Sequence, residues 1–202
     1  GESILVYGLQ NEPSATYSSS YIQTTTTAVT RAAETANDSG DAATFNDSEG
    51  VLMAEISALI DLDVSRYITL SDGTPSNRII FDLRPTQNVL RIVLVVTTSQ
   101  YSYDITLNNI TSNNKVAFKY KENDLALWVN GIEVNTSLSA NVPTENTFEQ
   151  LDFSSWDWAA PFYGKAKQVQ YFDSALTDLQ LETLTSWITF EAMVTAQLYT
   201  IY

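Results

Sequence analysis

The chain has 202 residues, of which 24 are Asp or Glu and 10 are Lys or Arg, so its formal net charge is −14 at pH 7. A surface this negative repels phosphate backbones and anionic lipids, which argues against binding to nucleic acids or membrane surfaces. The sequence contains neither Cys nor His. Disulfides, thiolate zinc sites and every mechanism that uses an imidazole are therefore excluded.

Residues 1–38 combine a short apolar segment with a long polar one. Residues 4–10 have the composition of a β-strand, and residues 17–30 are rich in Ser and Thr and lack an amphipathic period. The stretch resembles linkers of bacteriophage tail and virion proteins, in which one module ends and a lectin-like module begins. This resemblance implies that the chain is a piece of a longer protein. The alternative is that residues 4–10 add an edge strand to the domain that follows.

Five segments between residues 50 and 107 predict β-strands separated by turns. They are residues 50–59, 66–71, 78–83, 90–97 and 99–107. The apolar spacing of residues 50–59 also fits a helix. Because residues 90–97 are rich in β-branched side chains, that strand is expected to be central and buried on both faces. In the last segment, Tyr101, Tyr103 and Ile105 are expected on one side.

Residues 115–134 have the clearest local pattern. Val116, Phe118 and Tyr120 alternate with other residues, and the same period of two continues from residue 125 to residue 129. A polar turn at residues 121–124 separates these two strands. Asn130 and Gly131 predict a type I′ turn, because both central positions of that turn need a positive φ. Three antiparallel strands follow from this pattern.

This three-stranded unit resembles the laminin-G-like domains of the concanavalin A-like lectin group. The resemblance continues at residues 163–177, which are similar to the closing strand of that family and the entry to a short helix. Together the two motifs cover about residues 40 to 185. The resemblance implies an all-β fold, a two-sheet antiparallel jelly-roll sandwich, with one or two short C-terminal helices.

A capping box marks the start of one helix near the C-terminus. Thr177 is the expected N-cap and Gln180 its partner three residues later, with a hydrophobic staple between Leu176 and Leu181. Thr189 is a candidate cap for a second helix. Three parts of the chain are thus expected: a strand and linker at residues 1–38, a sandwich at 39–185, and a helix and tail packed on it at 186–202.

One loop combines aromatic rings with polar groups, as a sugar site requires. Within residues 153–163, the candidate carbohydrate-binding residues are Trp156, Asp157, Trp158 and Tyr163. The alternative is that the tryptophans fold back over the edge of the sandwich or pack at a subunit contact. Trp128 differs, because it alternates within a strand and is expected in the core.

The sequence contains only an incomplete form of a catalytic motif. Glycosidases of the concanavalin A-like fold use Glu-x-Asp-x-x-Glu, and Glu122 and Asp124 match its first half, but Leu127 stands where the second Glu is needed. The chain is therefore expected not to be an enzyme, and no catalytic residue is assigned. A glycoside hydrolase working through Glu122 and Asp124 remains the alternative.

Calcium is the one cofactor that the resemblance allows. Several aspartates are expected near strand ends, but the sequence has no EF-hand type loop, so no metal ligand is assigned. These aspartates are Asp72, Asp82, Asp104, Asp152, Asp157 and Asp173.

The predicted function is a non-catalytic carbohydrate-binding module of a phage tail fibre or virion adhesin. Its expected partners are a host cell-surface glycan and other virion proteins, with a homotrimer as one assembly, and with no nucleic acid and no membrane insertion. The expected location is the virion, or otherwise the extracellular space. The alternative from another class is a structural module that decorates or oligomerises the virion without binding glycan.

Overall fold

The computed structural model describes residues 36–60, 64–187 and 192. The chain divides into two compact units, residues 1–34 and 35–202, and every described residue belongs to the second. The expected strand at residues 4–10 and the expected cap at Thr189 lie outside the described residues.

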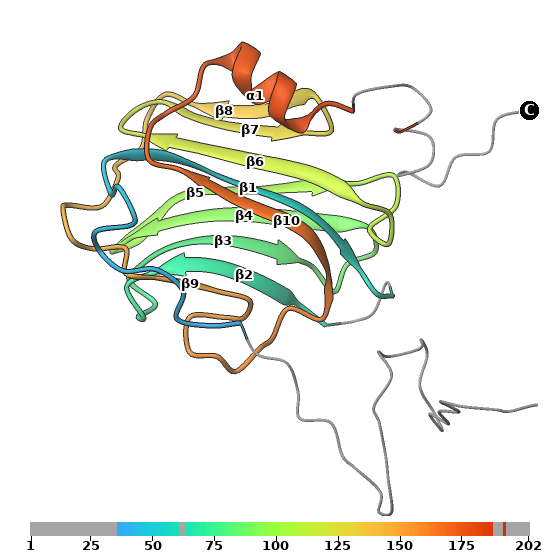
Figure 1. The fold of residues 1–202 in the computed structure, drawn as a ribbon, viewed down its shortest axis with the longest axis horizontal. Coiled ribbons are helices and arrows are strands. Elements are labelled where there is room, and N and C mark those ends of the chain that lie inside the picture. Colours follow the sequence, from blue (N-terminus) through green and yellow to red (C-terminus); the bar gives the residue numbers. More distant parts are fainter. Residues whose placement is uncertain (1–35, 61–63, 188–191, 193–202) are drawn as a thin grey trace, which may run out of the picture. The chain divides into compact units, whose positions relative to one another are not determined.

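The described unit is a jelly-roll sandwich of two five-stranded antiparallel sheets (Figure 1). One sheet has the strand order β10-β1-β6-β7-β8, and the other has the order β5-β4-β3-β2-β9. The strands are β1 (Glu49–Ala58), β2 (Arg66–Ser71), β3 (Asn77–Leu83), β4 (Val89–Val96), β5 (Thr98–Thr106), β6 (Asn114–Lys121), β7 (Leu125–Val129), β8 (Ile132–Ser137), β9 (Gln150–Asp152) and β10 (Gly164–Phe172). The all-β expectation is confirmed, and the ambiguous residues 50–59 form a strand rather than a helix.

The main core lies between the two sheets and contains side chains from both of them. Leu52 and Phe118 come from one sheet, and Ile68, Phe81 and Ile92 come from the other. All five side chains are fully buried. Since alternate residues of a strand point to opposite faces, the positions between them point away from this core.

The outer face of the β5-β4-β3-β2-β9 sheet corrects one prediction. β4 was expected to be buried on both faces, but its residues alternate between buried Leu90, Ile92 and Leu94 and partly exposed Arg91 and Val93. The prediction was wrong because β-branched composition does not reveal what covers a sheet. The central strands of the other sheet, β1, β6 and β7, are buried on both faces over most of their length.

The β6-β7-β8 unit has the predicted turns. Asp124 N donates to Lys121 O across the first turn at 2.9 Å. Asn130 has a φ of 52° and Gly131 a φ of 85°, the positive values that a type I′ turn requires.

Helix α1 (Asp178–Thr185) covers the outer face of the sheet that holds β6, β7 and β8 (Figure 1). Its capping box is formed as predicted by Thr177 and Gln180. Leu181 is fully buried in a second apolar cluster, where Leu176 and Leu184 pack beside it. Trp128 is buried as predicted, but it lies in this second cluster under α1 rather than between the sheets. No helix among the described residues is long and apolar enough to cross a membrane.

Candidate functional site

The predicted aromatic loop is a tight hairpin between β9 and β10, drawn in orange in Figure 1. Ser154 and Pro161 form an isolated antiparallel bridge, and Ser155 N donates to Ala160 O at 3.0 Å. Phe162 N closes the base by donating to Phe153 O at 2.7 Å. Backbone hydrogen bonds therefore fix the position from which the Trp156 and Trp158 side chains extend.

The hairpin is attached to β2 by a buried hydrogen bond. Thr69 Oγ1 donates to the backbone oxygen of Ser154 at 2.8 Å. Thr69 alternates with the core residues Ile68 and Leu70, so its side chain points to the outer face of the sheet. The hydrogen bond thus holds the hairpin over that outer face.

Between the hairpin and the sheet lies a hollow of about 380 Å³, which we call the Trp156 groove. Its floor is the outer face of β2 and β3, and its wall is the hairpin. Trp156 and Tyr67 contribute aromatic rings to it, and Arg78 and Asp157 contribute charges. The full lining is Tyr67, Thr69, Arg78, Ile80, Ser155, Trp156, Asp157, Ala159 and Ala160. Rings beside hydrogen-bonding groups suit a sugar, which has an apolar C–H face and polar hydroxyls.

The carboxylate of Asp157 is held by its own hairpin. Asp157 Oδ1 accepts a hydrogen bond from Ser155 Oγ at 2.6 Å and one from Ala159 N at 3.3 Å. The hydrogen bond from Ser155, followed by that from the Ala159 amide, lowers the pKa of Asp157. Asp157 is therefore ionised at neutral pH and keeps Oδ2 available as an acceptor for a ligand hydroxyl.

The four sequence-predicted site residues do not all meet in the groove. Trp156 and Asp157 line it, whereas Trp158 and Tyr163 do not. Trp158 has a φ of 60°, and its Nε1 donates to Oδ1 of the fully buried Asp152 at 3.1 Å. Trp158 is still 54% exposed and Tyr163 52% exposed. One edge of the Trp158 indole thus folds back onto the sandwich while much of its surface stays in contact with solvent.

Four groove residues come from strands that no pattern in the sequence connects with the loop. Tyr67 and Thr69 lie on β2, and Arg78 and Ile80 lie on β3. In the register of the two strands, Thr69 stands opposite Ile80. The period of two places all four on the face away from the core, which was the available signal. The sequence does not indicate that residues 155–160 fold over this face.

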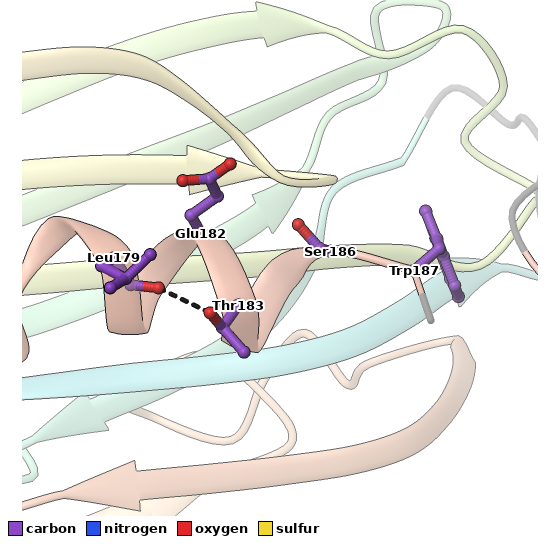
Figure 2. Close-up of a pocket in the computed structure, with 5 residues that line it drawn as sticks. All are labelled: Leu179, Glu182, Thr183, Ser186 and Trp187. Atoms are coloured by element: carbon purple, nitrogen blue, oxygen red, sulfur yellow. Dashed lines mark hydrogen bonds between the residues drawn. The ribbon is translucent and has the colours of Figure 1, made fainter. Parts of the chain in front are cut away.

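A second hollow, of about 300 Å³, lies beside α1 (Figure 2). It is lined by Leu179, Glu182, Thr183, Ser186 and Trp187. Figure 2 shows Leu179, Glu182 and Thr183 on α1 and Ser186 and Trp187 just beyond its end, with Thr183 Oγ1 donating to the backbone oxygen of Leu179 at 2.7 Å. Trp187 is the one aromatic residue there, and Lys115 Nζ lies 4.9 Å from its ring centroid. Because that ring is already in contact with a cation, this hollow is a weaker candidate for a sugar site than the Trp156 groove.

The incomplete glycosidase motif lies away from the groove. Glu122 is exposed at the turn between β6 and β7, and Asp124 forms an ion pair with Lys119 at 2.7 Å. Asp124 thus has a structural partner. In the part of the chain that the structure describes, no group of three or more Asp and Glu side chains could hold a metal ion.

No protein-family model and no curated protein matches the sequence. Solved structures share the fold. The CBM40 of Ruminococcus gnavus IT-sialidase, bound to α2,3-sialyllactose, has a TM-score of 0.57 and 14% identity over 69% of this chain and 84% of that one. Domain 4 of AbnA, a GH43 extracellular arabinanase of Geobacillus stearothermophilus in complex with arabinotriose, has a TM-score of 0.57 and 14% identity over 72% and 70%.

The heptameric SAP-like pentraxin of Limulus polyphemus has a TM-score of 0.59 and 15% identity, over 74% of each chain. The NanB sialidase of Streptococcus pneumoniae matches over only 25% of its own length. At these identities the chain is similar to lectin-like and pentraxin sandwiches in its fold alone.

Proposed function

We propose that this chain is a non-catalytic carbohydrate-binding module whose ligand lies in the Trp156 groove. The observation that carries the proposal is the combination in one hollow of two aromatic rings, Trp156 and Tyr67, with the charged groups of Arg78 and Asp157. Support also comes from two proteins of the same fold that hold sugars, one sialyllactose and the other arabinotriose.

The size of the groove fits this ligand class. Its volume of about 380 Å³ lies within the range of roughly 300 to 1,000 Å³ that small-ligand sites occupy. A sugar ring would stack its apolar face on Trp156, and Asp157 would accept hydrogen bonds from its hydroxyls. No described carboxylate pair in the groove has the arrangement of a glycosidase, so binding without cleavage is the expected outcome.

A glycan array followed by calorimetry on the best ligand tests the proposal. Trp156→Ala is expected to weaken binding by about tenfold or more, because stacking and the associated apolar burial contribute about 1.4 kcal/mol or more. Leu179→Ala is the matched control, because Leu179 is 72% exposed and lines the hollow beside α1 instead. If Leu179→Ala weakens binding and Trp156→Ala does not, the ligand binds outside the Trp156 groove.

We further propose that the module serves a virion adhesin such as a phage tail fibre, on the virion surface. Support comes from the resemblance of residues 1–38 to linkers of such proteins. Weak sugar sites that are repeated on a fibre gain avidity, which would suit a homotrimer. Light scattering of the purified chain is expected to give the mass of a trimer, and a monomer would contradict that assembly. A chain that assembles but binds no glycan would instead be a decorating or oligomerising module.

A further inference from the structure

Arg78 differs from the other arginines on the outer face of its sheet. Arg91 Nη2 donates to Asp104 Oδ2 at 2.8 Å, and Arg84 Nη1 lies 3.4 Å from Asp82 Oδ2. For Arg78, no hydrogen bond or ion pair joins the guanidinium to any residue that the structure describes, and its buried Nε, like that of Arg84, has no hydrogen-bond partner. A buried donor without an acceptor is costly, and a guanidinium without an ion pair keeps its remaining N–H donors for a ligand.

Arg78 lies in the groove because of its position on β3. Its neighbour Ile79 is fully buried in the main core, so Arg78 points to the outer face. The side chain is half-buried, which lowers the pKa of Arg78, with Tyr67 and Asp157 acting in the opposite direction. Because the ordinary pKa of an arginine lies far above neutrality, the guanidinium stays positively charged at neutral pH.

The carboxylates nearest to Arg78 already have other partners. Asp157 Oδ1 accepts from Ser155 and Ala159 within its hairpin, as described above. Asp72 Oδ1 accepts from the backbone nitrogen of Thr74 at 2.8 Å, and Asp72 Oδ2 accepts from Asn77 Nδ2 at 2.7 Å. Both side chains are therefore held in their own turns, and neither forms an ion pair with Arg78.

We propose, on the basis of the carbohydrate-binding function above, that the Trp156 groove selects sugars that carry a carboxylate and that Arg78 binds this group. The planar guanidinium matches a carboxylate with two parallel hydrogen bonds, while a lysine would offer only a point charge. Trp156 and Tyr67 would hold the ring that bears the carboxylate. Uronic acids and sialic acids share this chemistry.

The overall charge of the protein does not prevent such binding. The net charge of −14 repels an anionic sugar at long range. At physiological salt, screening limits that repulsion to about 8 Å, so direct contact with Arg78 determines selectivity. Asp157 also favours one orientation of the sugar, because a carboxylate placed on the Asp157 side of the groove would be repelled.

Matched pairs of acid and ester test the inference. The probes are the methyl glycosides of glucuronic acid, galacturonic acid and N-acetylneuraminic acid, each measured by calorimetry beside its carboxylate methyl ester. We expect at least one acid to bind about tenfold or more tightly than its ester, which is the effect of a charged hydrogen-bonded pair. Comparison of the three acids distinguishes uronic from sialic recognition.

Substitutions on the outer face of this sheet test whether Arg78 causes the difference in affinity between acid and ester. Arg78→Gln is expected to remove the difference between acid and ester, and Arg78→Lys to retain part of it. Arg91→Gln is the matched control, because Arg91 lies on the same face and is paired with Asp104. If Arg78→Gln does not fold, as judged by circular dichroism, Arg78→Lys carries the comparison because it keeps the charge but loses the fork.

The outcomes separate this inference from the proposed function. Equal binding of acid and ester, or a difference that survives in Arg78→Gln, overturns the carboxylate selectivity. If neutral glycans still bind through Trp156 in that case, the carbohydrate-binding function stands. If neither acidic nor neutral glycans bind, both proposals are wrong.

Discussion

Trp158 donates its indole N–H to Oδ1 of Asp152 at 3.1 Å, which joins the tip of an exposed hairpin to a fully buried carboxylate. The same Oδ1 accepts from Asp38 N at 2.7 Å, and Oδ2 accepts from Gln150 Nε2 at 2.7 Å. Asp152 therefore links its own strand and the tip of the following hairpin to Asp38, which is 114 positions away in the sequence. Trp158 supports the fold through its N–H, whereas Trp156 lines the groove.

Removing this N–H is expected to destabilise the domain. Trp158→Phe keeps an aromatic ring but takes one donor from the buried Asp152 carboxylate, which we expect to lower the free energy of unfolding by about 1 to 2 kcal/mol. Urea denaturation measures this change. Trp156→Phe is the control, and we expect it to leave the midpoint nearly unchanged. Equal effects of the two substitutions would show that the Asp152 hydrogen bond is not the cause.

The anchor between the hairpin and β2 affects both stability and binding. Thr69→Val is expected to reduce stability by about 1 kcal/mol, because the buried oxygen of Ser154 loses its donor. Glycan affinity is expected to fall as well, since the hairpin that forms the groove wall loses its attachment. Thr69→Ser keeps the hydroxyl and should retain most of the affinity in calorimetry. A glycan affinity that is unaffected by Thr69→Val would show that the anchor does not position the wall.

The N-cap of α1 is expected to stabilise this helix, which covers the second apolar cluster. Thr177→Ala removes the oxygen that accepts from Gln180 N, and N-cap substitutions of this kind cost about 1 kcal/mol. Thr183→Ala is a suitable comparison, because the Thr183 hydroxyl donates only to the exposed backbone of its own helix. Chemical denaturation of both variants should show a clearly larger loss for Thr177→Ala. A loss no larger than that of Thr183→Ala would contradict the role of the cap.

Asp82 gives stability a specific dependence on pH. Burial raises the pKa of Asp82, and a hydrogen bond with Ser65 and the charge of Arg84 oppose this effect only in part. The folded state therefore holds the proton more tightly than the unfolded state, so the contribution of Asp82 is most favourable below the unfolded pKa of about 3.9. It is lost as the pH rises through the folded pKa.

The Asp82→Asn variant tests this pH dependence of stability, because its side chain at position 82 is uncharged at any pH. Its stability relative to the parent protein is expected to rise from acidic to neutral pH and then to level off. Urea unfolding of both proteins between pH 3 and pH 8 measures the difference. A difference that does not change with pH would contradict the raised pKa.

Local patterns in the sequence were sufficient for most strands and for several turns, but they left residues 50–59 ambiguous and did not predict β9. Val116, Phe118 and Tyr120 alternate because one face of β6 meets the core, and that period is visible in the sequence itself. Asn130 and Gly131 specify their turn through backbone sterics alone, and Thr177 specifies the start of α1 through one side-chain hydrogen bond. Each of these features depends on residues a few positions apart.

The groove depends on contacts between distant residues, so local sequence patterns indicate only part of it. Trp156 and Asp157 were found because their chemistry is visible in one loop. Arg78 and Tyr67 join them only through strand pairing on the sheet face and through the Thr69 hydrogen bond to Ser154. The sequence by itself determined the alternation of side chains and the aromatic loop. The tertiary structure decided which outward side chains the loop would meet, because that depends on which segments pack together across the sandwich.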